Sequence, residues 1–231
     1  MKLKAPPSWA LKVTMAVTGA IWAIFVLIHL YGNLKVFQGP EKFDGYAHWL
    51  RHAFEPFFPE TGVLWLMRIV LVIALILHVG AAAILYYRGR KFRGKHRAKN
   101  YRNGLQAVSA RLMPLTGVLI LIFIIFHILD LTVGAQPIAT ESFQGPTATK
   151  SSAYSNLVAS FSRPLVAIFY SVMMVFLAIH VTHGAKNIAV DLGAMGKRLR
   201  MTFVIIGAVA AIAILIGNAS IPIAVQMGWL N

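Results

Sequence analysis

Four histidines lie singly in four different apolar segments of the chain: His29, His78, His127 and His180. An ionisable side chain at membrane depth is costly, so each of them is a functional hypothesis by default. Imidazole is also the commonest protein ligand for transition metals. Four such residues in four segments predict two metal sites with two histidines each, and the metal that suits this arrangement is haem iron.

The composition indicates that these histidines lie in a lipid bilayer. Of 231 residues, 58% are hydrophobic and 13% are charged, whereas a soluble domain usually has about 25% charged residues. The chain has no cysteine, so it cannot by itself build a disulfide framework, a thiolate zinc site or a cysteine-held iron–sulfur cluster. The net charge of +15 would suit a nucleic-acid binder, but its location between apolar segments argues against a nucleic-acid partner.

Five apolar segments have the length of about 20 residues that crosses a hydrocarbon core. They are residues 13–34, 64–87, 111–133, 163–185 and 201–222. We therefore expect an all-α integral membrane bundle of five transmembrane helices, formed by a single domain over residues 1–231 without a convincing internal repeat. Pro164, behind Ser162 as a cap, should begin the fourth helix, and Pro222 should close the fifth.

The basic residues predict an orientation. Residues 88–102 include eight lysines and arginines and no acid, and residues 186–200 add four against Asp191. By the positive-inside rule, the N-terminus should be cytoplasmic and the C-terminus outside. The basic segment 88–102 could set the orientation of the chain and attract anionic membrane lipid, or it could dock a cytoplasmic partner. His96 within it is expected to be a solvated charge.

Depth predicts how the four histidines pair. At a rise of about 1.5 Å per residue, His29 and His127 reach the outer half of the membrane, and His78 and His180 belong to the inner half. A four-helix bundle with inward-facing ligands would then hold two haems stacked across the membrane. Each histidine alone could instead hydrogen-bond a neighbouring helix. A proton-coupled transporter with histidine relays would need no haem at all.

Other residues near the four histidines permit two interpretations each. His183 is on the same helical face as His180 and competes for the inner ligand role, although a neighbouring role fits it better. His48 and His52 lie in an aromatic-rich outer segment, which more often forms an interfacial belt than a site. Small residues within the segments could allow close helix packing or leave room for a flat macrocycle; they are Gly19, Gly80, Gly117 and Gly184.

The sequences around the four histidines resemble a known family. Leu-Ile-His-Leu at 27–30, Ile-Leu-His-Val at 76–79, Ile-Phe-His-Ile-Leu-Asp at 125–130 and Ile-His-Val-Thr-His-Gly at 179–184 are similar to the cytochrome b558 subunit of succinate:menaquinone oxidoreductase (succinate dehydrogenase, complex II). The resemblance implies a polypeptide of the bacterial cytoplasmic membrane with five transmembrane helices and two b haems. It also implies that the chain anchors a flavoprotein subunit and an iron–sulfur subunit on the cytoplasmic face.

Carried over by position, the resemblance implies that His29 and His127 ligate the outer haem iron, and that His78 and His180 ligate the inner one. It implies electron transfer from the iron–sulfur partner to a quinone, with menaquinone expected, and no catalysis on succinate by this chain itself. A b-type cytochrome subunit of another membrane oxidoreductase, such as a hydrogenase or formate dehydrogenase, is the alternative with the same chemistry.

Quinone reduction requires protons, so an acid or a histidine should lie near the outer haem. The candidates are Asp130, His48, Glu41 and Asp44. Asp130, one turn beyond His127, could instead be a plain interfacial charge. A quinone site on the cytoplasmic side, with Arg88 or Arg111 as hydrogen-bond donor, is also compatible with the sequence. The outer loop at 134–162 has no predicted function.

Overall fold

The computed structural model describes residues 6–93, 105–147 and 150–231, and the regular structure in these ranges is helical. The elements in chain order are α1 (Ser8–Asn33), the short helix η1 (Leu34–Gln38), α2 (Pro40–Arg51), α3 (Gly62–Arg93), α4 (Leu105–His127), the π-helical turn η2 (Ile128–Val133), α5 (Ala153–Phe161), α6 (Pro164–Asp191) and α7 (Lys197–Gln226). Five of the described helices are long and apolar enough to cross a membrane, and they coincide with the five predicted segments. The predicted all-α membrane bundle is confirmed.

Two details of the predicted helix ends differ from the structure. Pro222 lies inside α7, which continues to Gln226. A proline removes only one N–H donor, and Pro222 is fully buried, so packing keeps this last part of α7 helical. At the start of α6, Pro164 is in the first turn as expected, but the N-cap position belongs to Arg163. The hydroxyl of Ser162 instead donates back to the carbonyl of Val158 in α5 at 2.8 Å.

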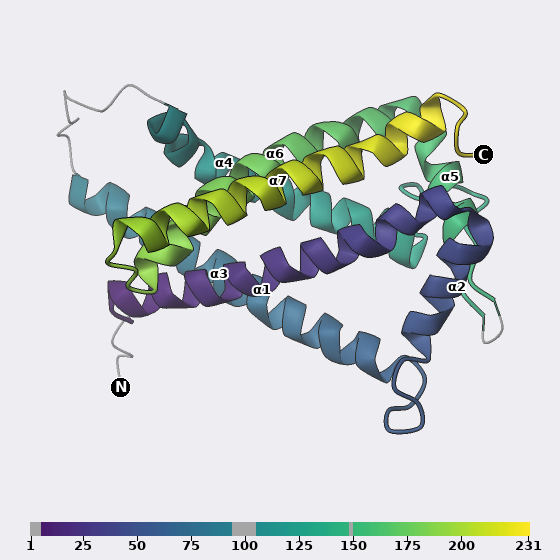
Figure 1. Cartoon of the computed structure of the whole chain (residues 1–231), viewed down its shortest axis with the longest axis horizontal. Helices are drawn as coiled ribbons and strands as arrows, with labels where there is room; N and C mark the ends of the chain where they lie inside the picture. The colour runs from purple at the N-terminus through teal and green to yellow at the C-terminus, as the bar shows by residue number, and fades with distance from the viewer. Residues whose placement is uncertain (1–5, 94–104, 148–149) are drawn as a thin grey trace.

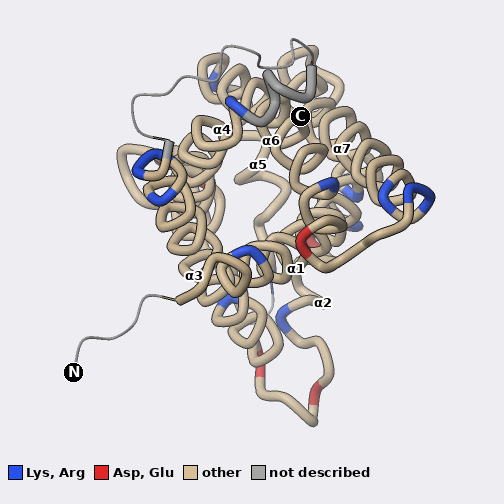
Figure 2. The backbone as a smooth tube through the Cα atoms, turned by 90° about the vertical axis from the view of Figure 1, so that its left-hand side faces the viewer, with Lys and Arg blue, Asp and Glu red and all other residues tan. Residues whose placement is uncertain are grey.

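The long helices pack in one layered bundle (Figure 1). α6 and α7 lie side by side along their length, α1 packs against α3 and α6, and α4 packs against α6. Seen along the bundle, α3 and α4 lie on one side and α7 lies on the other (Figure 2). This order puts α1, α3, α4 and α6, the helices that contain the four histidines, next to one another.

The two ends of the bundle differ. We call the end with the N-terminus and residues 192–196 the N-terminal end, and the end with α2, α5 and the C-terminus the C-terminal end (Figure 1). Seen from the N-terminal end, lysines and arginines gather on the near turns of the helices (Figure 2). Much of the basic segment 88–102, including His96, falls in residues 94–104, outside the described residues.

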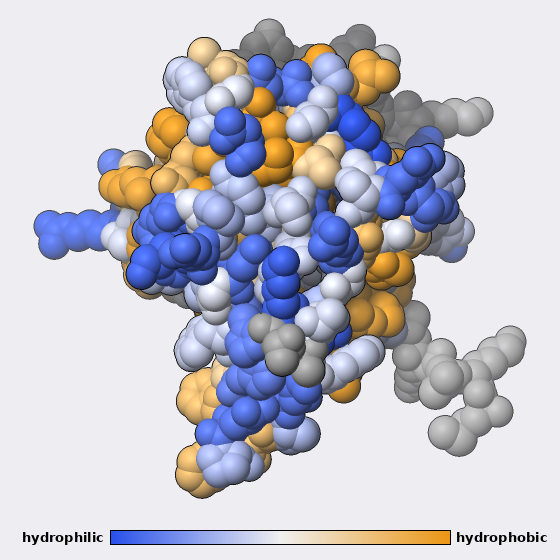
Figure 3. Space-filling view, turned by 90° about the vertical axis from the view of Figure 1, so that its right-hand side faces the viewer, coloured by the Kyte–Doolittle hydropathy of each residue, from blue (hydrophilic) through white to orange (hydrophobic). Residues whose placement is uncertain are grey.

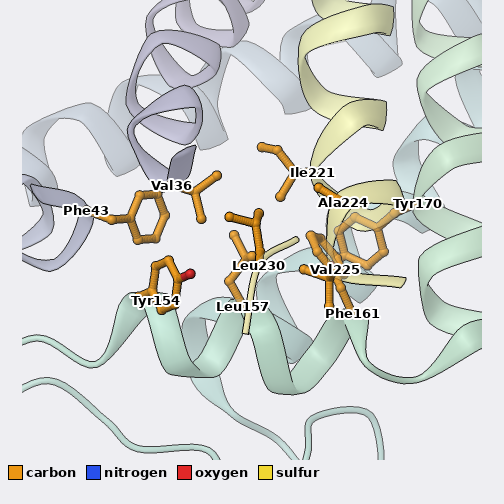
Figure 4. Close-up of a cluster of buried hydrophobic side chains, with 10 residues drawn as sticks. All are labelled: Val36, Phe43, Tyr154, Leu157, Phe161, Tyr170, Ile221, Ala224, Val225 and Leu230. Atoms are coloured by element: carbon orange, nitrogen blue, oxygen red, sulfur yellow. The ribbon is translucent and has the colours of Figure 1, made fainter. Parts of the chain in front are cut away.

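The C-terminal end is closed by a buried apolar cluster that joins η1, α2, α5, α6 and α7 (Figure 4). Asp44 in α2 helps to fix α5, because its Oδ1 accepts the N–H of Tyr154 at 2.8 Å in the first turn of that helix. Part of the loop at 134–162 is therefore the helix α5, packed on the bundle. The outer face of this end is largely hydrophilic, with apolar side chains on its flanks (Figure 3).

Candidate functional site

The four histidines meet as two pairs inside the bundle. The ring centres of His29 and His127 are 5.8 Å apart with an angle of 80° between the rings. The ring centres of His78 and His180 are 6.5 Å apart with an angle of 60°. The first pair joins α1 to α4 toward the C-terminal end, and the second joins α3 to α6 toward the N-terminal end. This is the pairing that depth along the helices predicts.

The donor set fits haem iron. Two imidazoles that hold one metal ion from opposite sides have ring centres about 6 Å apart, because each metal–nitrogen bond is about 2 Å long. Among the described residues, no group of three or more His, Cys, Asp or Glu side chains could hold a metal ion. A haem iron needs only axial protein ligands, since the macrocycle binds the other positions.

A threonine on α1 fixes the orientation of His78 on α3. The hydroxyl of Thr18 lies 2.6 Å from the carbonyl oxygen of Thr14 and 3.1 Å from Nδ1 of His78. A hydroxyl has one proton to donate, and the shorter distance assigns it to the carbonyl. The hydroxyl oxygen therefore accepts the Nδ1–H of His78, which leaves the lone pair of Nε2 available for a metal.

His180 on α6 has the same arrangement with a threonine on α4. The hydroxyl of Thr116 lies 3.1 Å from the carbonyl oxygen of Met113 and 3.0 Å from Nδ1 of His180. Thr116 is fully buried, so its oxygen has no water with which to exchange these contacts. Hydrogen bonds of this kind to the second ring nitrogen set the tautomer and ring orientation of metal-bound histidines. The Thr18 contact thus holds His78 in the tautomer that binds a metal through Nε2, and the Thr116 contact fixes the orientation of the His180 ring.

The pair toward the C-terminal end has aromatic neighbours. Phe25 stacks on His29 with ring centres 5.5 Å apart and 14° between the rings, and Phe123 lies 5.8 Å from His127. The hydroxyl of Tyr170 on α6 lies 3.4 Å from Nδ1 of His127. Both histidines of this pair thus have an aromatic ring as a neighbour in their own helix.

The two helices that supply these threonines share a short sequence pattern. Residues 18–29 and 116–127 share Thr-Gly at the start, the pair Ile-Phe in the middle and His at the end. Eleven residues are about three helical turns, so the threonine and the histidine of each segment share a face. α1 and α4 each supply one histidine of their own pair and the threonine that holds a histidine of the other pair.

The repeated glycines stand where the helices approach closely. A Cβ on Gly19 would lie 3.2 Å from Cε1 of His78, and a Cβ on Gly117 would lie 3.7 Å from Cε1 of His180. The contact at Gly19 is tighter than ordinary van der Waals packing, so a Cβ there would require His78 to shift by a few tenths of an ångström. A Cβ on Gly80 or Gly184 would meet nothing within 4 Å of the chain.

The remaining candidates lie at different places. His183 is half-buried on α6, beyond His180 toward the N-terminal end. His48 stacks on His52 in the C-terminal part of α2, with ring centres 4.4 Å apart. Asp130 in η2 is 1% exposed and forms an ion pair with Arg163, so it is not a plain interfacial charge.

Three further candidates have defined surroundings. Glu41 is in the first turn of α2, and Asp44 caps α5 as described above. At the N-terminal end, a guanidinium nitrogen of Arg88 donates to the hydroxyl of Ser8 at 3.2 Å. One carboxylate oxygen of Asp44 thus has a structural role. The aromatic side chains Trp49, Phe54 and Phe57 are exposed, as expected of an interfacial belt.

Sequence reasoning missed the residues that hold the histidines, namely Thr18, Thr116 and Tyr170. Each of these residues contacts a histidine on another helix, so the sequence around it does not indicate the contact. The repeated Thr-Gly and His at a spacing of eleven residues was the one signal in the sequence that could have indicated the two threonines.

The model of the succinate dehydrogenase/fumarate reductase transmembrane subunit family matches residues 93–217, which is more than half of the chain. The chain belongs to this family of cytochrome b-type membrane anchor subunits, as the resemblance around the histidines predicted. The matched residues include His127 and His180. No curated protein and no solved structure matches the chain. Membership associates the chain with other succinate dehydrogenase or fumarate reductase subunits in a membrane, and it disfavours the transporter and the other oxidoreductases.

Proposed function

We propose that the chain is the diheme electron-transfer and anchor subunit of a succinate:quinone oxidoreductase, and that it passes electrons from an iron–sulfur subunit to menaquinone. His29 and His127 would be the axial ligands of one haem iron, and His78 and His180 those of the other. The observation that supports this proposal best is the meeting of the four histidines as two facing pairs. When bound, haem b accepts and donates single electrons, which is the chemistry of this transfer.

The chain's own residues would hold and orient the two groups. The hydroxyl of Thr18 would accept the Nδ1–H of His78, and the hydroxyl of Thr116 would hold the ring of His180 through its contact with Nδ1. Along α1, the level of Thr18 and the level of His29 are about 16 Å apart, so the two sites would lie at different depths of the membrane. His183 would be a neighbour of the inner site rather than a ligand.

The orientation and the partners belong to the same proposal. The lysines and arginines at the N-terminal end favour a cytoplasmic location for that end by the positive-inside rule. The flavoprotein and iron–sulfur subunits would dock there, on the cytoplasmic face of a bacterial membrane. Electrons would enter near His78 and His180 and leave near His29 and His127.

We propose that quinone is reduced at the C-terminal end. This end has His48 next to His52, and Nδ1 of His52 lies 3.1 Å from Oε1 of Glu55, so groups that exchange protons are present at the surface. Asp130 is buried with its partners, which favours an indirect role over contact with quinone. At the N-terminal end, a guanidinium nitrogen of Arg88 donates to Ser8, and the other donors of this side chain would be available to a quinone at that end.

Replacement of single histidines tests the ligand assignment. In the complex purified with its partner subunits, His127→Ala should remove the optical spectrum of one haem and leave the other, because the two ligand sets are disjoint. His48→Ala, on α2, should leave both haem spectra intact. Loss of both haems from folded His127→Ala would contradict separate sites. An inner haem abolished by His183→Ala and retained in His180→Ala would contradict the choice of ligand.

A further inference from the structure

Asp130 is a buried carboxylate held by three donors from two other segments. Its Oδ1 accepts from the guanidinium of Arg163 at 2.6 Å, and its Oδ2 accepts from the hydroxyls of Ser160 at 2.6 Å and Tyr170 at 3.0 Å. It lies in η2, the π-helical turn that directly follows His127. Departures of this kind from regular α-helix are frequent at functional sites.

The partners of Asp130 are themselves fixed. Arg163 also donates to the carbonyl oxygens of Ile138 at 2.6 Å and Ser160 at 3.2 Å, so it ties the loop after η2 to the end of α5. The ring of Tyr170 packs against Phe161, with ring centres 4.8 Å apart, in the cluster that closes the C-terminal end (Figure 4). Neither group can turn away without breaking these contacts.

The direction of the hydrogen bonds follows from the number of protons. Asp130, paired with Arg163, accepts only, so the single proton of the Tyr170 hydroxyl goes to its Oδ2. The hydroxyl oxygen of Tyr170 can then only accept at its contact with Nδ1 of His127, 3.4 Å away. The chain of donors therefore runs from His127 through Tyr170 to the buried carboxylate.

Comparison of the segments that end at His29 and His127 indicates that only one histidine of this pair has a carboxylate one turn further on. The position three residues beyond His127 is Asp130, whereas the position three residues beyond His29 is Gly32. The other pair, His78 and His180, contacts threonine hydroxyls, which are neutral and whose other contacts are to backbone carbonyls. Only at His127 does the path that we trace in the described residues end at a carboxylate.

We propose that Tyr170 is a positioning residue for His127, and that Asp130 acts through Tyr170 to make His127 a more strongly donating ligand. The proposal rests on the ligand assignment given under Proposed function. A hydrogen bond from the second ring nitrogen to an acceptor raises the basicity of a metal-bound histidine. A more basic ligand stabilises the oxidised iron, and hydrogen bonding around the ligands sets the reduction potential. The arrangement thus lowers the potential of the outer haem.

The test is a redox titration of the purified complex with the Tyr170→Phe substitution, followed by absorption and electron paramagnetic resonance spectra. The variant keeps the packed ring and removes the hydroxyl. We expect an upward shift of the potential of one haem, a change in the resonance signature of that haem only, and full haem content. Loss of the outer haem alone would also support positioning by Tyr170.

Tyr154→Phe is the matched control. It removes another buried tyrosine hydroxyl from the same cluster, one that contacts the carbonyl of Asn231 at 3.4 Å rather than a histidine. We expect both potentials to stay as in the unmodified complex. An equal shift in Tyr154→Phe, or unchanged potentials and spectra in Tyr170→Phe, would overturn the proposal.

The result is distinguishable from failure of the ligand assignment. The haem that shifts in Tyr170→Phe should be the haem that His127→Ala removes. If His127→Ala removes one haem and Tyr170→Phe shifts the other, the inference about Tyr170 is wrong while the diheme function stands. An unmodified complex with fewer than two haems would contradict the function itself.

Discussion

Thr18 on α1 and His78 on α3 are joined by a contact of 3.1 Å between the hydroxyl oxygen and Nδ1. The threonine has already given its proton to the backbone, so the histidine must be the donor. Thr116 on α4 contacts Nδ1 of His180 on α6 at 3.0 Å, so each histidine of this pair has a threonine hydroxyl from another helix at its Nδ1. These contacts orient both histidine rings through neutral hydroxyl groups.

The threonine contacts predict a selective effect on the inner haem. Valine has nearly the same shape as threonine, so Thr116→Val preserves the packing around His180. It removes the hydroxyl that contacts Nδ1 of His180. We expect the potential of the inner haem to rise or its affinity to fall by about 10-fold to 100-fold, as measured by redox titration and haem retention. Thr182→Val is the control, since the hydroxyl of Thr182 donates to Ala178 in its own helix. An effect of equal size in Thr182→Val would contradict the assigned role.

The close approach at Gly19 predicts a steric effect. A Cβ there would already lie 3.2 Å from His78, so the larger side chain of Gly19→Leu should displace the histidine and reduce the content of the inner haem. Gly89→Ala in α3 should have no effect, because a Cβ at that position meets nothing within 4 Å. Haem absorption per milligram of purified complex measures both. Full inner haem content in Gly19→Leu would show that the helices do not approach as described.

The ion pair between Asp130 and Arg163 predicts a large loss of stability when one partner is removed. Asp130→Ala removes a buried carboxylate and leaves the half-buried guanidinium of Arg163 unpaired, which should cost up to about 3 kcal/mol. Lys12→Ala removes the exposed partner of a longer pair with Asp191, at 3.9 Å, and should cost at most about 1 kcal/mol. Thermal unfolding of the detergent-solubilised complex compares them. Equal melting temperatures for the two variants would contradict the larger stabilising role predicted for the pair of Asp130 and Arg163.

The orientation can be tested with single cysteines, because the natural chain has none. Met195 at the N-terminal end is 86% exposed, and Phe57 at the C-terminal end is 88% exposed. In intact cells, a membrane-impermeant thiol reagent should label Phe57→Cys and should label Met195→Cys only after the cells are opened. Labelling of Met195→Cys alone in intact cells would reverse the orientation.

The helices and the pairing of the histidines were predictable because both follow from positions along the sequence. The length of an apolar segment predicts a membrane helix, and the position of a residue in that helix predicts its depth. His29 and His127 have similar depths, as do His78 and His180. Pro222 misled the prediction of the end of α7, because tertiary packing outweighed the loss of one backbone donor.

The contacts of the polar side chains were harder to predict from the sequence. Asp130 was visible as an acid near His127, but its burial depends on Arg163 and Ser160, more than 25 residues away in the chain. The tertiary folding of α5 and the loop before it brings these residues together, and no local pattern encodes that folding. Tyr170 is one of several aromatic residues in α6, and only its distance to His127 distinguishes it.

The number of haems per polypeptide tests the central claim most directly. The complex should be purified with its partner subunits, and its haem should be counted by the pyridine haemochrome assay against the amount of this chain. Two facing histidine pairs predict two b haems per chain. One haem, or none, would contradict the account.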